Sequence, residues 1–507
     1  MRRVVLLGFA LLASPLQAQT AHSAPADRAA ATITAADVAH RIGVIADDSM
    51  LGRDTPSRGL ELTAAYIAGQ FRRFGLKPGG DSGTFLQRYP ITRRQFDAAG
   101  SRVEFRAGTR DTTARFDRSA RYLQGALSGE PLTGPVVLVG GALGPDDVSR
   151  MALRDKVVIY VSDYMAPPSD RAAQAARALR LAAPRAVVLA ANLDPDAFAA
   201  RIPKNPPART AVDLRLVSPP FVEVTDAVIA PLLRAAGVDL AAVRADPKPA
   251  FRALPEVSVR LVIKETVLAR LSAPNAVGIL EGSDPALRHE YLVYSAHMDH
   301  IGVSPGQPDS VNNGADDDAS GTAGVVELAQ AFSRPGARPR RSIIFLTVSG
   351  EEKGLWGSRY FTEHPPVPID RIVADLNMDM IGRNWRDTIV AIGKEHSDLG
   401  TTLARVNAAH PELNMTAIDD RWPEERFYYR SDHYNFARKG IPVLFFFNGV
   451  HADYHRVTDS PDKIDSEKES RIVRLLYYLG REVADADAPP KWNPESYRTI
   501  VDDPAGH

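Results

Sequence analysis

The stretch S-I-I-F-L-T-V-S-G-E-E-K-G, residues 342–354, joins an apolar run to two adjacent glutamates. The run is typical of a buried strand. Neighbouring side chains of an extended chain point to opposite faces, so Glu351 and Glu352 could not both reach one site from within a strand. A turn at Gly350 would remove that restriction. The stretch therefore predicts a buried strand that ends in a turn with two carboxylates, and the alternative is an ordinary solvated turn.

The composition of the chain sets wide limits on its class. Its 507 residues suggest two or three domains, and 44% apolar with 24% charged residues are globular values. The formal net charge of −1, without any basic block, gives no electrostatic case for binding nucleic acid. The chain has no cysteine, so any metal site would have to use His, Asp and Glu.

Residues 1–18 resemble a secretory signal peptide. Two arginines precede an apolar stretch from Val4 to about Leu16, and small residues lead to an expected cleavage after Ala18. The stretch is too short for a membrane span, although a retained anchor is the alternative. We therefore expect an exported protein, periplasmic or secreted, with no membrane span after cleavage. The absence of disulfides favours a bacterial origin over a eukaryotic extracellular one.

The region before residue 257 has two parts of different character. Residues 19–120 begin with an Ala-rich leader, expected to be mobile to about residue 33, and continue with helical patterns that end near Gly75. Residues 121–256 contain three β-branched runs, an Ala/Arg-rich helix around 171–183, and no cluster with metal-ligand spacing. We expect this second part to be a small α/β or β-rich domain without a catalytic role.

Residues 257–488 alternate strands with helices, and residues 489–507 form a C-terminal tail. Such alternation predicts an α/β domain with a mostly parallel sheet covered on both faces, and with ligand sites at the carboxyl ends of the strands. Strands are expected at 291–299, 342–349, 371–380 and 441–449, and helices at 321–333, 399–410 and 469–486.

Polar residues follow several of these expected strands. His297 and Asp299 are two residues apart and share one face of an extended chain, where a carboxylate can hold an imidazole in one tautomer. Three consecutive aspartates, residues 316–318, precede an apolar helix and could serve as ligands or only as caps. Asp379 stands among apolar residues at a strand end, where an acid must be paired, protonated or metal-bound.

His455 lies beyond the last expected strand, next to Tyr454. Together the strand ends offer two imidazoles and three carboxylates, a suitable set for two divalent ions that share a bridging group. Zinc is the favoured ion for mixed imidazole and carboxylate ligands, and cobalt or manganese could substitute.

Several segments resemble the successive motifs of the M28 zinc aminopeptidase family: SAHMDHIG, NNGADDDASGTAGVVELA, TVSGEEKGLWGS, LNMDMIGRN and DYHRVTDSPDKI, with RSDHYNFARKGIP resembling a further SDH segment. The similarity spans roughly 260–480, and residues 121–256 resemble the protease-associated domain inserted in several exopeptidase families. The resemblance implies a zinc-exopeptidase, phosphorylase/hydrolase-like fold, in which a mixed, mostly parallel central sheet is flanked by helices.

The resemblance also implies the roles of individual residues. Five would bind two zinc ions per chain: His297, Asp317, Glu352, Asp379 and His455. Asp317 would bridge the ions, with His297 and Asp379 on one ion and Glu352 and His455 on the other. The family pattern further implies a cis peptide bond between Asp317 and Asp318.

Three more residues receive catalytic roles from the resemblance. Glu351 would be the general base, Asp299 would support His297, and Tyr454 would stabilise an oxyanion, unless it is only a packing residue. Asp432 and His433 could equally support the site or the sheet end. Five histidines receive no role and are expected at the surface or in packing: His300, His364, His396, His410 and His451.

The implied activity is a two-zinc aminopeptidase that acts on peptides with a free N-terminus. Alternatives on the same fold are a carboxypeptidase or dipeptidase specificity and a glutaminyl cyclase that works with one zinc. A binding protein that keeps the architecture is the alternative outside enzymes, and the complete ligand set argues against it.

Overall fold

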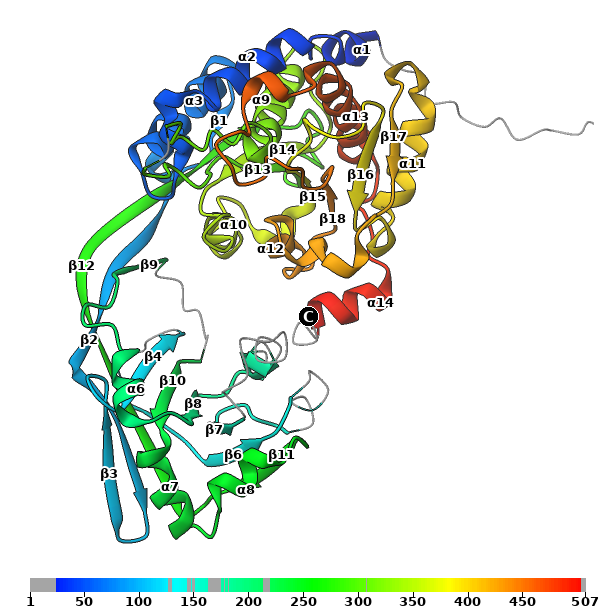
Figure 1. Ribbon diagram of the computed structural model, residues 1–507. Coiled ribbons are helices and arrows are strands. Elements are labelled where there is room, and N and C mark those ends of the chain that lie inside the picture. Colours follow the sequence, from blue (N-terminus) through cyan, green and yellow to red (C-terminus); the bar gives the residue numbers. More distant parts are fainter. Residues whose placement is uncertain are drawn as a thin grey trace, which may run out of the picture.

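The computed structural model describes residues 24–125, 130–143, 147, 151–162, 175–176, 178–180, 182–212, 219–306 and 308–502 (Figure 1). The expected signal peptide lies outside the described residues, as does much of the Ala/Arg-rich helix expected around 171–183.

The larger sheet has 12 strands and a parallel centre. Four parallel strands lie side by side in the order β14 (Ser342–Val348), β13 (Tyr291–His297), β15 (Ile372–Met378) and β18 (Val443–Phe446). Each of them was expected from its apolar run. Every side chain of β14 and β15 is buried, as is usual for parallel strands covered on both faces.

Antiparallel strands extend this centre on both sides. β12 (Val257–Leu280) pairs with β14 and β2 (Leu86–Ala107) pairs with β12, while β16 (Thr388–Ile392) pairs with β18. The outer strands are β3 (Arg110–Arg115), β17 (Thr416–Ile418), β1 (Lys77–Pro78), β5 (Leu132–Thr133) and β9 (Arg209–Val212). The sheet is therefore mixed, with a parallel centre, and the predicted α/β fold class is confirmed.

Helices cover both faces of the sheet (Figure 1). One face carries α3 (Arg58–Arg73), α9 (Gly321–Phe332), α11 (Leu399–Ala409) and α13 (Ser466–Asp485). The other carries α10 (Trp356–Glu363) and α12 (His433–Ala437). The amphipathic pattern expected to end near Gly75 is α3, and that glycine has a positive φ of 77°, as a helix-ending residue often does.

The N-terminal leader is helical and packed over its described part, contrary to the expectation. Residues Ala24–Ala30 form α1, and α2 (Ala35–Ile45) follows. Ala26 and Ala29 are buried in the same core as α9 and α13, and Arg474 Nε donates a hydrogen bond to the carbonyl of Ile33 at 2.8 Å. The prediction was wrong because small alanine side chains on one helix face permit close packing without a strong apolar pattern.

A second sheet lies below the first in Figure 1, with the strand order β11-β6-β7-β8-β10-β4. The three β-branched runs form the parallel strands β6 (Val136–Gly140), β7 (Val157–Val161) and β8 (Ala186–Ala191), next to β10 (Phe221–Thr225). β11 (Ala250–Ala253) and β4 (Ala120–Gln124) form the edges of this sheet. The helices α6 (Pro195–Ala200), α7 (Asp226–Ala235) and α8 (Leu240–Ala245) belong to the same region.

The core of this second region draws on residues beyond 121–256 at both ends. Val103 and Phe105 of β2 and Val259 and Leu261 of β12 are buried in it. β2 and β12 pair along most of their length and run from one sheet region into the other (Figure 1). Because one pair of strands serves two cores, a boundary drawn from sequence composition falls inside the second core.

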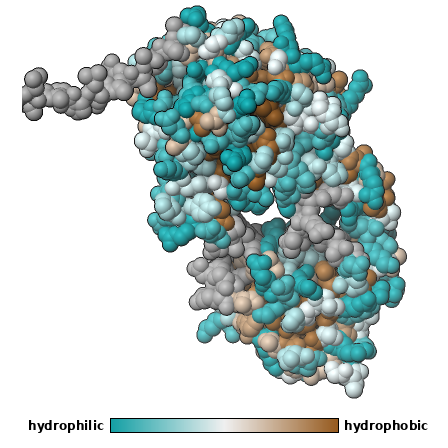
Figure 2. All heavy atoms as spheres, turned by 180° about the vertical axis from the view of Figure 1, so that it is seen from behind, coloured by the Kyte–Doolittle hydropathy of each residue, from teal (hydrophilic) through white to brown (hydrophobic). Residues whose placement is uncertain are grey.

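The C-terminal segment, expected as a tail, packs on the protein as far as residue 502. Its helix α14 (Pro494–Tyr497) follows Trp492, whose Nε1 donates to the carbonyl of Gly440 at 2.9 Å, and Ile500 is buried. Among the described residues, none of the helices combines the length and apolarity needed to cross a bilayer. The face shown in Figure 2 is mostly hydrophilic, with hydrophobic residues in separate patches.

Close packing of α13 on β13 depends on Gly480. A Cβ at this position would lie 1.6 Å from Oη of Tyr294, a fully buried residue whose hydroxyl donates to the carbonyl of Leu476 at 2.7 Å. The helix that covers the centre of the sheet therefore has no room for a larger residue here.

We predict that Gly480→Ala destabilises the protein, because overpacking a rigid core costs about 1–3 kcal/mol. The measurement is the thermal midpoint, with Gly69→Ala of α3 as the matched control. A Cβ at Gly69 meets nothing within 4 Å, so the better helix propensity of alanine should keep or raise the midpoint. Equal midpoints for the two variants would contradict the prediction.

Candidate active site

The carboxyl ends of the four parallel strands meet at one edge of the sheet, where ligands bind in open α/β folds. His297 is the last residue of β13, and Asp379 directly follows β15. Glu351 and Glu352 follow β14, and His455 lies in the segment after β18. The alternation of strands and helices thus gathers residues that are up to 158 positions apart in the chain.

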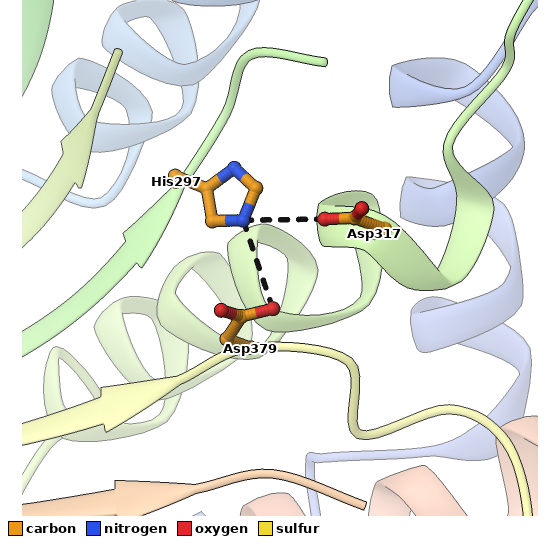
Figure 3. A group of neighbouring side chains, drawn as sticks. All are labelled: His297, Asp317 and Asp379. Atoms are coloured by element: carbon orange, nitrogen blue, oxygen red, sulfur yellow. Dashed lines mark ion pairs between the residues drawn. The ribbon is translucent and has the colours of Figure 1, made fainter. Parts of the chain in front are cut away.

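One group of donors forms around His297 (Figure 3). Its Nε2 lies 3.3 Å from Oδ1 of Asp317 and 3.6 Å from Oδ1 of Asp379. All three side chains are buried. The three donor atoms are close enough to surround one ion.

A second group uses the other carboxylate oxygen of Asp317. Its Oδ2 lies 3.2 Å from Nε2 of His455, which in turn lies 3.2 Å from Oε2 of Glu352. His300 joins them, with Nδ1 2.9 Å from Oε1 of Glu352. The sequence had placed His300 at the surface or in packing, whereas its ring is fully buried beside these carboxylates. Asp317 therefore faces a different group with each oxygen.

The consecutive aspartates have different partners. Oδ2 of Asp318 accepts from the backbone N–H of His297 at 3.1 Å, and Oδ1 accepts from the N–H of Gly321 at 2.8 Å, at the start of α9. Asp318 therefore caps the start of α9, and the carboxylate of Asp317 faces the two donor groups. The peptide bond between the two residues is cis, as predicted.

Asp316 and Asp459 also stabilise the turn that carries Asp317. Oδ1 of Asp316 accepts from the N–H of Gly382 at 2.7 Å, and Oδ2 lies 3.1 Å from Nε2 of His451. Oδ2 of Asp459 accepts from the N–H groups of Asp316 and Asp317 at 3.1 Å. His451, which had no expected role, therefore links the segment that carries His455 to the turn that carries Asp317.

The two glutamates converge as the turn at Gly350 allows. Gly350 has a φ of 73°, and a Cβ there would lie 2.7 Å from Oη of Tyr89. Glu351 lines a pocket together with His297, whereas Glu352 belongs to the second group. Burial raises the pKa of Glu351 well above its ordinary value in the metal-free protein.

The carboxylate of Asp299 makes closer contacts with the turn at Gly350 than with the imidazole of His297. Its Oδ2 accepts from Oγ1 of Thr55 at 2.9 Å, and its Oδ1 accepts from the N–H of Glu351 at 3.3 Å. Nδ1 of His297 lies 3.2 Å from the backbone oxygen of Asp299 and 3.8 Å from its carboxylate. Burial raises the pKa of Asp299 to about 6. The backbone carbonyl is thus the nearer partner of the imidazole.

Residues 431–433 contact the site through a residue that the sequence reasoning missed. Ser431 Oγ donates to Oδ2 of Asp379 at 2.9 Å. Asp432 and His433 are fully buried; burial raises the pKa of Asp432 to about 7 and lowers that of His433 to about 3. Of the SDH segment, it is the serine that contacts a candidate ligand, and the motif itself was the available signal.

Arg53 is a second residue that sequence reasoning missed. Its buried guanidinium donates to the carbonyls of Met298 at 2.8 Å, Gly314 at 2.9 Å and Ile45 at 3.0 Å. These contacts join the N-terminal segment to the loops that follow His297 and precede Asp317. They also place a buried cation near the carboxylates of the site. No pattern in the sequence around Arg53 predicts this position.

A pocket of about 60 Å³ opens beside the first group. Tyr454 lines it and stacks on His455, with 3.9 Å between the ring centres, and burial raises the pKa of its phenol. The apolar part of the lining consists of Met380, Phe427, Phe445, Phe447 and Val450. The pocket therefore joins the carboxylates and imidazoles to an aromatic wall.

The residues present fit divalent metal ions. Four buried atoms have no hydrogen-bond partner within the described part of the chain: Oδ2 of Asp317, Oε1 of Glu352 and both ring nitrogens of His300. Such unpaired atoms are costly unless a cation satisfies them. Donor atoms about 2.1 Å from a tetrahedral zinc ion lie about 3.4 Å apart. The contacts of His297 and His455 with the carboxylates, at 3.2–3.6 Å, match that spacing.

The fold and the site together define a class: an α/β protein with two imidazole–carboxylate groups at the carboxyl edge of a parallel sheet. Residues 275–480 match the model of peptidase family M28.

Three relatives with known names are similar to part of the chain. The chain is 25% identical to aminopeptidase YwaD of Bacillus subtilis (strain 168) over 45% of its own length and 49% of the relative's. It is 29% identical to a probable zinc metalloprotease of Leptosphaeria maculans over 36% and 48%, and 31% identical to leupeptin-inactivating enzyme 1 of Streptomyces exfoliatus over 37% and 38%. The chain spans about half the length of these relatives or less.

Solved structures also show similarity. An aminopeptidase from Aneurinibacillus sp. strain AM-1 aligns over 92% of this chain and 98% of its own, at 19% identity and a TM-score of 0.49. A zinc aminopeptidase from Bacillus subtilis aligns over 90% and 96%, at 17% identity and a TM-score of 0.46.

Thr55 provides a test of how the site is held together. Its buried Oγ1 donates to Asp299 and accepts from the N–H of Gly350 at 3.1 Å. We predict that Thr55→Val lowers the thermal midpoint, because an isosteric methyl leaves two buried polar groups unpaired at about 1–3 kcal/mol each. The control is Thr63→Val, which removes one hydrogen bond within α3. A midpoint no lower for Thr55→Val than for the control would contradict this prediction.

Proposed function

We propose that the protein is a two-zinc exopeptidase and, more specifically, an aminopeptidase that removes N-terminal residues from peptides. The observation that carries the proposal is the shared carboxylate of Asp317, which faces one imidazole–carboxylate group with each oxygen. Relatives named as zinc metalloprotease and aminopeptidase support it.

In this proposal His297 and Asp379 bind one ion, Glu352 and His455 bind the other, and Asp317 binds both. Bound zinc supplies Lewis acidity toward water and toward a carbonyl oxygen. His455 has the most exposed side chain of the five, at 37%, so it is the candidate ligand that faces solvent.

Glu351 is the general base in this proposal. It lines the same pocket as His297 and Asp379 and is placed to take a proton from the attacking water and to return it to the leaving amine. Tyr454 also lines the pocket, and its neutral phenol can donate a hydrogen bond to the oxyanion that forms at the scissile carbonyl.

The pocket favours a particular kind of substrate. Its carboxylates attract an α-ammonium group, and its aromatic wall suits an apolar side chain. We therefore propose peptides with a free N-terminus and an apolar first residue as substrates. The candidate signal peptide supports export, and neither candidate metal group has a member within the described part of 121–256, which supports a non-catalytic role for that region.

Replacing Glu351 and replacing Glu352 should have different effects on metal binding and turnover. Glu352→Ala removes a donor of the second group, so this variant should bind one metal less per chain. Glu351→Ala should keep both metals while turnover falls about 10²–10⁴-fold, the usual contribution of a positioned general base. The measurements are metal content per chain and kcat.

Two results would count against these roles. If Glu351→Ala loses a metal while Glu352→Ala keeps two, the roles are reversed. If both variants keep full activity, neither glutamate binds a required metal or acts as the base. Glu363→Ala, an exposed-helix change that breaks an ion pair with Arg359, serves as the control for a surface glutamate.

Blocking the substrate's amine tests the aminopeptidase assignment. We predict hydrolysis of leucyl amides and peptides with a free amine, and loss of hydrolysis when the same compounds carry an N-acetyl group. Lysyl and glutamyl analogues should be poorer substrates, because the aromatic wall cannot solvate a charged side chain. Cleavage of the blocked peptides from their carboxyl end would instead establish a carboxypeptidase.

A further inference from the structure

We propose that His300 is a sixth protein ligand of the metal centre, and that its Nδ1 binds the ion held by Glu352, His455 and Asp317. The inference rests on the two-metal part of the proposed function and adds a donor to it. Three separate observations lead to it: the burial of the ring, the distances around it, and the packing that fixes it.

The ring of His300 is completely buried, and among the described residues neither of its nitrogens has a hydrogen-bond partner. A buried imidazole normally finds at least one partner, because desolvating an unpaired polar group is costly. His433 shows the usual behaviour at comparable burial, since its Nε2 lies 2.7 Å from the carbonyl of Tyr428. An ion bound at Nδ1 would satisfy the lone pair that His300 otherwise leaves unused.

The distances around Nδ1 suit a ligand. It lies 2.9 Å from Oε1 of Glu352 and 3.7 Å from Oδ2 of Asp317, and these three donors can surround one ion. Although 2.9 Å is within hydrogen-bond range, Oε1 of Glu352 has no hydrogen-bond partner among the residues that the structure describes, so the two atoms are not aligned for donation. Close but unaligned donor atoms are what two ligands of one ion present to each other.

His455 supplies a second imidazole beside the same two carboxylates. His455 Nε2 lies 3.2 Å from both Asp317 and Glu352, and the rings of His455 and His300 are nearly perpendicular, with 5.6 Å between their centres. Two imidazoles and two carboxylates would thus hold the ion of the second group. The first group has one imidazole, that of His297, and two carboxylates.

Packing holds His300 in this orientation. A Cβ at Gly314 would lie 2.6 Å from the Cγ and Cδ2 atoms of the imidazole, so only glycine lets the ring occupy its place. Gly314 also has a φ of 57°, which favours glycine for the backbone itself. The donor is therefore positioned before any metal binds, as a ligand needs to be.

The test compares His300→Asn and His300→Ala with the wild type. The amide nitrogen of asparagine can stand near the position of Nδ1 and donate a hydrogen bond, but it is a poor zinc ligand. We expect both variants to bind the more weakly held zinc at least about 100-fold less tightly, beyond the usual effect of losing a supporting hydrogen bond. Zinc affinity is measured by competition with a chelator, without reference to activity.

Visible absorption of bound cobalt and X-ray absorption of bound zinc test the number of ligands directly. In the cobalt-loaded protein, loss of a ligand should change the visible absorption of one ion, and both variants should show the same change. X-ray absorption of the wild type with two zinc ions should count three imidazoles shared between them, whereas two would overturn the proposal. This last measurement decides the question even if His300→Ala does not fold.

Two outcomes separate this inference from the proposed function. If His300→Asn keeps the affinity and the cobalt spectrum of the wild type, His300 is not a ligand, although two metals still bind. If the wild type binds fewer than two metals, the proposed function fails together with this addition. His410→Asn is the matched control, because His410 is buried against Tyr478, outside both groups, and its replacement should leave metal affinity unchanged.

Discussion

The carboxylate of Asp317 is the constraint on which the rest of the centre depends. To face two groups at once it must project away from the helix that follows it, and Asp318 makes this possible by taking over the cap of α9 and the N–H of His297. The surrounding carboxylates repel one another in a buried site. Arg53 and the imidazoles offset part of that repulsion, and bound cations would offset the rest.

The fold holds the candidate ligands in fixed positions, although the mutual repulsion of their carboxylates favours a wider separation. Parallel strands deliver His297 and Asp379 from positions fixed by the sheet ladder, whereas Glu352 and His455 come from turns. The turns are held by buried polar contacts from Asp299, Asp459 and Asp316. Sites built on rigid elements and braced by further hydrogen bonds keep their geometry when the metal leaves.

Much of the fold and the candidate ligands could be predicted from the sequence because the signals were local. Apolar runs marked the central strands, and the family resemblance gave roles to polar residues that follow them or lie in the motifs between them. Arg53 and Ser431 escaped notice because their contacts are set by tertiary structure, and the burial of His300 depends on the shape left by Gly314. The leader was misjudged because alanine-rich helices owe their stability to packing partners far along the chain.

The contacts of Arg53 with residues far along the chain affect the order in which the protein folds. Its contacts with Met298 and Gly314 span 245 and 261 residues, with the whole second sheet in between. Contacts of such separation carry a large loop-closure entropy and form slowly. We therefore expect the individual sheets to acquire their secondary structure early and the centre to close last, when the N-terminal segment docks onto the completed parallel strands.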